Sequence, residues 1–154
     1  MDHHRWMSRA VDLAHRCPRS ETAFAVGAVI VDASGREIAS GFSRDDDPRV
    51  HAEESALLKA SGDARLREAT IYSTLEPCSE RASRPHATCT SLIIAAGIPH
   101  VVIAWREPDV FVHCEGVALL RAAGVDVLEL PSFAAGAQEP NLHLGVLAGL
   151  GRRL

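Results

Sequence analysis

Three side chains that can bind a metal lie in the middle of this sequence, and they constrain the fold more than any other feature. His51 begins the sequence His-Ala-Glu, Cys78 follows a proline, and Cys89 comes after a further ten residues. Neutral imidazole and thiolate are donors that Zn²⁺ prefers, and a catalytic zinc typically takes three protein ligands and leaves a fourth position for water. The sequence therefore predicts a zinc centre built from His51, Cys78 and Cys89, and a fold that brings these segments together.

A carboxylate follows the histidine closely. Glu53 stands two residues after His51, so it lies at the rim of the metal if His51 begins a helix. A carboxylate in that place can take a proton from a metal-activated water and pass it to a leaving group. Glu53 is therefore the predicted catalytic residue.

The hydrophobic pattern predicts helices that alternate with strands after an initial β-hairpin. The predicted helices cover residues 4–17, 52–62, 87–96 and 114–123, and the predicted strands cover 24–31, 36–42, 69–75, 98–105 and 125–130. The hairpin turns at 32–35, and a short helix is expected in the tail, 131–154.

This order of elements predicts an α/β fold with three layers, α/β/α, around a mixed five-stranded sheet. Strands separated by helices run parallel and are covered by helices on both faces. His51 and Cys89 then both fall at helix starts, where the helix dipole favours a thiolate. The length of 154 residues suits one domain spanning 1–154, with the least regular part in the tail.

Charge and composition exclude some partners. The formal net charge is −4, whereas a surface that follows nucleic-acid phosphates usually has an excess of basic residues. The two small arginine clusters, Arg81 with Arg84 and Arg36 with Arg44, are expected to be solvated loop charges. The three aspartates of the loop 43–48 are also expected to be solvated rather than metal-binding.

Cysteine usage and hydropathy favour the cytoplasm. Four cysteines do not form the dense framework of a small secreted domain, and the polar start of the sequence is not a signal peptide. The apolar runs are too short to span a bilayer. Cys17 and Cys114 are expected to be buried thiols.

Two of these motifs resemble the zinc-dependent cytidine deaminase-like superfamily, whose pattern is His-x-Glu followed by Pro-Cys and a second cysteine. His51-Ala-Glu53 and Pro77-Cys78 match it, but most members have two residues between the cysteines. The ten-residue loop between Cys78 and Cys89 is similar to the loop in the deaminase domain of bifunctional riboflavin-biosynthesis proteins. Three further segments are also similar to that domain, namely Leu75–Ser79, Val26–Val31 and Gly116–Val125. The resemblance covers most of residues 5–130.

The resemblance implies a cytidine deaminase-like fold and hydrolytic deamination of an amino-substituted pyrimidine or related N-heterocycle. The riboflavin-pathway diaminopyrimidine nucleotide is one such substrate, and homodimers or homotetramers are expected. Arg84 and His86, in the loop before the second cysteine, are candidate substrate-binding residues. Phe24 is a third, because it stands where the riboflavin branch has an asparagine that contacts the pyrimidine.

Three alternatives stay open from the sequence. The substrate could instead be a free nucleobase or nucleoside of the cytosine or guanine type. The chain could be a zinc-binding partner subunit without turnover. The zinc could be purely structural, in which case a fourth ligand would come from Cys114, His86 or His113.

Overall fold

The computed structural model describes residues 2–81, 87–108 and 114–144, and its five strands form one mixed sheet. The strand order is β2-β1-β3-β4-β5, with β1 antiparallel to both β2 and β3, and with β3, β4 and β5 parallel. The strands are β1 (Gly27–Val31), β2 (Glu37–Phe42), β3 (Thr70–Leu75), β4 (His100–Trp105) and β5 (Asp126–Glu129). The predicted mixed sheet with parallel later strands is confirmed.

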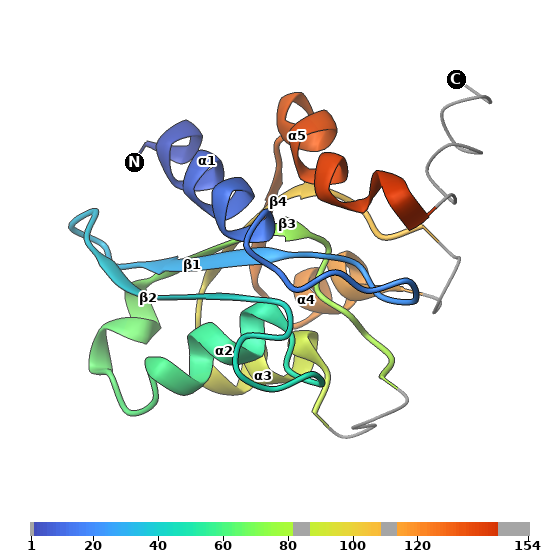
Figure 1. Ribbon diagram of the computed structural model, residues 1–154. Helices are drawn as coiled ribbons and strands as arrows, with labels where there is room; N and C mark the ends of the chain where they lie inside the picture. The colour runs from blue at the N-terminus through green and yellow to red at the C-terminus, as the bar shows by residue number, and fades with distance from the viewer. Residues whose placement is uncertain (1, 82–86, 109–113, 145–154) are drawn as a thin grey trace.

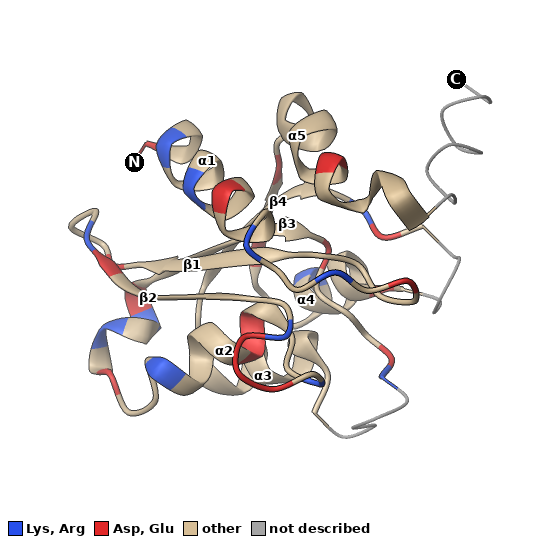
Figure 2. Ribbon diagram, viewed as in Figure 1, with Lys and Arg blue, Asp and Glu red and all other residues tan. Residues whose placement is uncertain are grey.

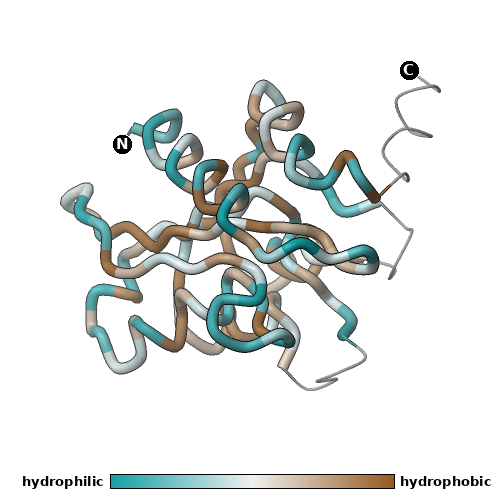
Figure 3. Tube along the Cα trace, in the orientation of Figure 1, coloured by the Kyte–Doolittle hydropathy of each residue, from teal (hydrophilic) through white to brown (hydrophobic). Residues whose placement is uncertain are grey.

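Helices cover both faces of the sheet, as predicted (Figure 1). One face carries α1 (His3–Ala14) and α5 (Ala134–Gln138), and the other carries α2 (Ala52–Lys59), α3 (Cys89–Ala96) and α4 (Gly116–Ala122). Successive side chains of β1 lie on opposite faces of the sheet. Val29 packs in the hydrophobic cluster under α1, and Ile30 packs in the cluster under α2 and α3. Figure 3 shows the resulting apolar centre in brown and the hydrophilic loops in teal.

The first strand begins later than the hydrophobic run that predicted it. The hydrophobic run predicts a start at residue 24, but β1 begins at Gly27. The side-chain amide of Asn141 accepts from the Ala25 N–H at 2.6 Å and donates to the Ala25 carbonyl oxygen at 3.1 Å. Because the Asn141 side chain binds both the N–H and the carbonyl oxygen of Ala25, these groups do not pair with a neighbouring strand.

The remaining differences concern shorter segments. Helix α1 ends at Ala14, so Cys17 lies beyond it, and Cys17 and Cys114 are both half-buried rather than buried. In the ranges that the structure describes, three 3₁₀ helices are absent from the prediction, namely η1 (Ala64–Glu68), η2 (Pro131–Phe133) and η3 (Glu139–Leu144). Within the described part of the chain, no helix has the length and apolar character needed to cross a membrane.

Two of the arginines predicted to be solvated are bonded to protein groups instead. Arg81 is buried and forms an ion pair with Glu54. Arg44 donates to the carbonyl oxygens of Pro18 at 2.9 Å and Phe24 at 3.2 Å. Arg36 is exposed, as predicted. Hydropathy alone places these side chains in water, whereas a buried carboxylate pairs with the buried Arg81 and backbone carbonyls bind the half-buried Arg44.

Two glycines allow helices to approach the segments that carry the predicted ligands. A Cβ on Gly41 of β2 would lie 2.6 Å from the carbonyl oxygen of Ala52, the first residue of α2. A Cβ on Gly116, the first residue of α4, would collide with the carbonyl oxygen of Pro77. The absence of a side chain at these positions lets α2 and α4 lie directly against the chain beside His51 and Cys78.

Candidate metal centre and catalytic pocket

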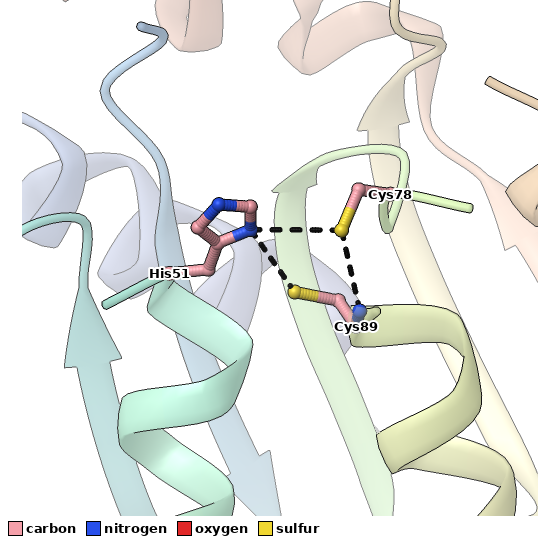
Figure 4. Close-up of side chains that lie close together, drawn as sticks. All are labelled: His51, Cys78 and Cys89. Atoms are coloured by element: carbon pink, nitrogen blue, oxygen red, sulfur yellow. Dashed lines mark hydrogen bonds between the residues drawn. The ribbon is translucent and has the colours of Figure 1, made fainter. Parts of the chain in front are cut away.

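The structure brings the three predicted ligands together from three elements (Figure 4). His51 immediately precedes α2, Cys78 follows β3, and Cys89 is the first residue of α3. The Nδ1 atom of His51 lies 3.6 Å from Sγ of Cys78 and 3.3 Å from Sγ of Cys89. The three ligand atoms all lie within 4.8 Å of one another, and one imidazole with two thiols is a donor set that suits zinc.

Among the described residues this metal-ligating group has three members, which leaves a position for a water molecule. Cys114 does not join it, since its Sγ donates instead to the Pro77 carbonyl oxygen at 3.3 Å. His86 and His113, the other suggested fourth ligands, lie outside the described residues. The described geometry therefore favours an open site over a closed structural one.

Local backbone structure holds the two cysteines in place. Thr88 caps α3, its Oγ1 accepting from the Ser91 N–H at 3.2 Å, so that the helix begins at Cys89. The Cys89 N–H donates to Sγ of Cys78 at 3.2 Å, and the Thr90 N–H donates to the Cys78 carbonyl oxygen at 3.1 Å. The start of α3 thus supports Cys78 as well as Cys89 and favours a thiolate there.

The thiols and the imidazole are electrostatically coupled. The hydrogen bond between the two sulfur atoms lowers the pKa of Cys78 and raises the pKa of Cys89, because one thiol ionises and the other keeps its proton. Burial lowers the pKa of His51, but the hydrogen bond to Cys78 and the negative charge there outweigh it, so that this pKa is raised. The pKa values of the three ligand groups therefore depend on one another.

Glu53 lies in the first turn of α2, buried, and lines the same pocket as His51 and Cys78. Burial, followed by the negative charge of Cys78, raises the pKa of Glu53 to about 7. A carboxyl group with a pKa near neutrality can both accept and release a proton at physiological pH. The position and the pKa of Glu53 therefore suit the predicted transfer of protons.

The pocket that contains these residues has a volume of about 450 Å³. Phe24 forms part of its lining and packs edge to face against Trp105, with ring centroids 5.7 Å apart. Arg44, Arg49 and Glu80 line it as well. Arg84 and His86, the other two predicted substrate-binding residues, lie outside the described residues.

Two glutamates escaped prediction. The buried carboxylate of Glu76 accepts from the Glu107 N–H at 3.1 Å and from the Val117 N–H at 2.9 Å, and so connects the ends of β3 and β4 to α4. Glu107 lines the pocket, and burial together with the charge of Cys78 raises its pKa to about 7. Neighbouring parallel strands end at the same edge of a sheet, where ligands bind in α/β folds, so the signal in the sequence is a glutamate within two residues of each strand end, Glu76 after β3 and Glu107 after β4.

Comparison with known proteins points to one family of enzymes. The model of the cytidine and deoxycytidylate deaminase zinc-binding region matches residues 1–105. The diaminohydroxyphosphoribosylamino-pyrimidine deaminase of Schizosaccharomyces pombe is 43% identical over 136 residues, covering 86% of this chain and 33% of that protein. The riboflavin biosynthesis protein RibD of Escherichia coli is 37% identical over 128 residues, covering 79% of this chain and 32% of that protein.

A solved structure agrees with these matches. The diaminohydroxyphosphoribosylaminopyrimidine deaminase/5-amino-6-(5-phosphoribosylamino)uracil reductase of Thermotoga maritima is 34% identical, with a TM-score of 0.73 over 88% of this chain and 38% of that chain. The expected cytidine deaminase-like fold is therefore confirmed. The chain spans about a quarter to a third of the length of the curated relatives that it matches.

Proposed function

The chain belongs to the cytidine and deoxycytidylate deaminase zinc-binding family, and from this premise we propose that it catalyses the hydrolytic deamination of an amino-substituted N-heterocycle. The observation that carries the proposal is the position of Glu53. This buried carboxyl group lines one pocket with a metal-ligating set that leaves a coordination position free. A site that served only to fix the fold would have no use for it.

The proposed reaction replaces a ring amino group by oxygen. His51, Cys78 and Cys89 would hold zinc, and zinc bound there would supply the Lewis-acid chemistry that makes water a nucleophile at neutral pH. The Glu53 carboxylate takes one proton from that water as its oxygen bonds to the ring carbon. Glu53 then delivers the proton to the amino nitrogen, the carbon–nitrogen bond breaks, and ammonia leaves. The second proton of the water moves from the oxygen to the adjacent ring nitrogen, so that one water is consumed and the ring carbon ends as a carbonyl.

The proposed substrate is a phosphorylated diaminopyrimidine of riboflavin biosynthesis, in line with the names of the relatives from S. pombe and E. coli. The apolar ring of Phe24 offers a surface on which a flat heterocycle can pack. Arg49 lines the pocket, and an arginine guanidinium binds phosphate well. Arg84 stays a prediction for binding the substrate phosphate, and His86 stays a prediction for lining the pocket.

Replacing Glu53 with glutamine tests the catalytic assignment. The Glu53→Gln variant keeps the size of the side chain but cannot carry the proton, so turnover is expected to fall at least 100-fold while bound zinc stays at one equivalent. Ammonia release and metal content are the two measurements. Turnover that survives the substitution would show that another group moves the proton.

A substrate panel tests the ring and its phosphorylation state. Ammonia release is measured with aminopyrimidines, aminopurines, and their ribosides and phosphates. Turnover confined to the phosphorylated diaminopyrimidine supports the proposed substrate. Turnover of cytosine or guanine derivatives would favour the alternative of a nucleobase or nucleoside deaminase, and no turnover with any compound would favour a non-catalytic subunit.

We further propose a homodimer or homotetramer in the cytoplasm. Three helices on one face of the sheet carry exposed apolar side chains, Leu58 on α2, Ile94 on α3 and Leu119 on α4, which a second copy could cover. All four cysteines are free, which suits a reducing compartment. Light scattering at several protein concentrations measures the oligomeric state, and a monomer throughout would refute the first part.

A further inference from the structure

A single arginine contacts the chain near all three predicted zinc ligands. One terminal nitrogen of Arg81 donates to the carbonyl oxygen of Ala87 at 3.1 Å, and the other donates to the carbonyl oxygen of Arg49 and to Oε1 of Glu54 at 2.8 Å. The side chain is almost fully buried, with 2% exposed, and that of Glu54 has 7% exposed. Among the described residues the Arg81 Nε has no partner, so the terminal nitrogens make all of these bonds.

The contacts of Arg81 reach a segment next to each of the three predicted ligands. Arg81 itself is three residues after Cys78, Ala87 is two residues before Cys89, and Arg49 is two residues before His51. We propose that Arg81 is a positioning residue for the zinc centre, which fixes the spacing of the three ligands by holding the segments that lead to them. This inference rests on the zinc centre of the proposed function.

Glu54, the ion-pair partner of Arg81, also contacts the backbone at the start of α2. Oε1 of Glu54 also accepts from the N–H of His51 at 3.3 Å, so the carboxylate contacts both the arginine and the histidine backbone. It compensates the buried positive charge, which would otherwise be very unfavourable away from water. The pair therefore connects the start of α2, with His51 and Glu53, to the loop between the cysteines.

The loop explains why such a residue is needed. Two hydrogen bonds from the start of α3 reach Cys78, but ten residues lie between the two cysteines, and neither of these bonds reaches the segment before His51. Metal ligands depend on supporting hydrogen bonds for their orientation, and removal of such support typically costs 10–100-fold in metal affinity. A planar guanidinium can serve three acceptors in different directions at once, which the ammonium of lysine does less well.

The competing explanation is that the pair stabilises the fold and nothing else. Breaking a buried ion pair by removing one partner is strongly destabilising, whereas replacing both partners by apolar side chains is often neutral. We would therefore compare Arg81→Met, Glu54→Leu and the double variant. Arg36→Met, which changes an exposed arginine of the hairpin, is the matched control.

Two measurements on the zinc-loaded proteins decide between the explanations, and neither needs substrate. One is the rate of zinc transfer to a chromophoric chelator, and the other is the midpoint of urea unfolding. For a positioning residue, the double variant regains the wild-type midpoint but still loses zinc at least 10-fold faster than wild type and Arg36→Met. A double variant that regains both properties would overturn the proposal.

A lysine variant covers the case in which the double variant does not fold. Arg81→Lys keeps the charge opposite Glu54 and is expected to remain folded, yet to bind zinc about 10-fold more weakly, because it cannot reach all three acceptors. The absorption spectrum of the cobalt-substituted protein should change with it. An unchanged affinity and spectrum would overturn the proposal, whereas a failure of the deaminase assignment would leave both measurements unaffected.

Discussion

Replacing Glu107 with glutamine is expected to remove a strong pH dependence from the stability of the metal-free protein. The pKa of Glu107 is raised from 4.5 to about 7, first by burial and second by the charge of Cys78. The folded protein therefore binds this proton more tightly than the unfolded chain does. Stability contributed by the protonated carboxyl is present below pH 4.5 and is lost as the pH rises through 7.

The size of the effect on the free energy of unfolding follows from the pKa shift of Glu107. One pKa unit corresponds to about 1.4 kcal/mol, so a rise from 4.5 to about 7 changes the free energy of unfolding by up to about 3 kcal/mol. Glutamine carries no titrating proton and cannot show this change. The free energy of unfolding of Glu107→Gln relative to wild type should increase by up to that amount between pH 4.5 and pH 8.

Urea unfolding at half-unit pH steps measures this difference. Glu68→Gln, an exposed glutamate of η1, controls for the general effect of exchanging a carboxyl for an amide. Zinc bound at Cys78 would offset the negative charge that forms part of the cause, so the difference should shrink in the zinc-loaded protein. A difference between Glu107→Gln and wild type that stays constant with pH would refute the reasoning.

Three further predictions concern the segments around the pocket. Gly116→Ala should lower the free energy of unfolding by about 1–3 kcal/mol, measured with urea, because the new methyl group meets the Pro77 carbonyl oxygen. Asn141→Ala should lower it by about 2–4 kcal/mol, because the buried N–H and carbonyl of Ala25 both lose their partner; Leu142→Ala, at an exposed neighbour, should change it little. Removing zinc with a chelator should lower the melting temperature, and one equivalent of zinc should restore it.

Much of the fold follows from patterns within short stretches of sequence. The strands and helices follow from hydrophobic periodicity, and the parallel half of the sheet follows from the helices between the later strands. The places of His51 and Cys89 follow in the same way, because each lies where a polar loop meets a helical pattern. These properties depend on near neighbours in the chain, which a sequence displays directly.

The environment of Arg81 could not be predicted in this way. An arginine in a polar loop is normally solvated, and what buries this one is Glu54, 27 residues earlier in the chain. Glu107 was missed because its importance depends on β3 and β4 ending side by side. Basic and acidic segments are interspersed over the ribbon in Figure 2, so composition alone does not distinguish the buried pair from surface charges.

The hydrogen bonds between Asn141 and Ala25 have a consequence for the order in which the molecule can assemble during synthesis. The predicted zinc ligands all lie between residues 51 and 89, so the metal centre needs no later part of the chain to supply a donor. The side of the pocket formed by Phe24 does need a later part of the chain. Ala25, the residue next to Phe24, is hydrogen-bonded to Asn141, which comes 116 residues later in the sequence. On the ribosome, we expect zinc to be bound before Asn141 has emerged, and the substrate side of the pocket to be completed last.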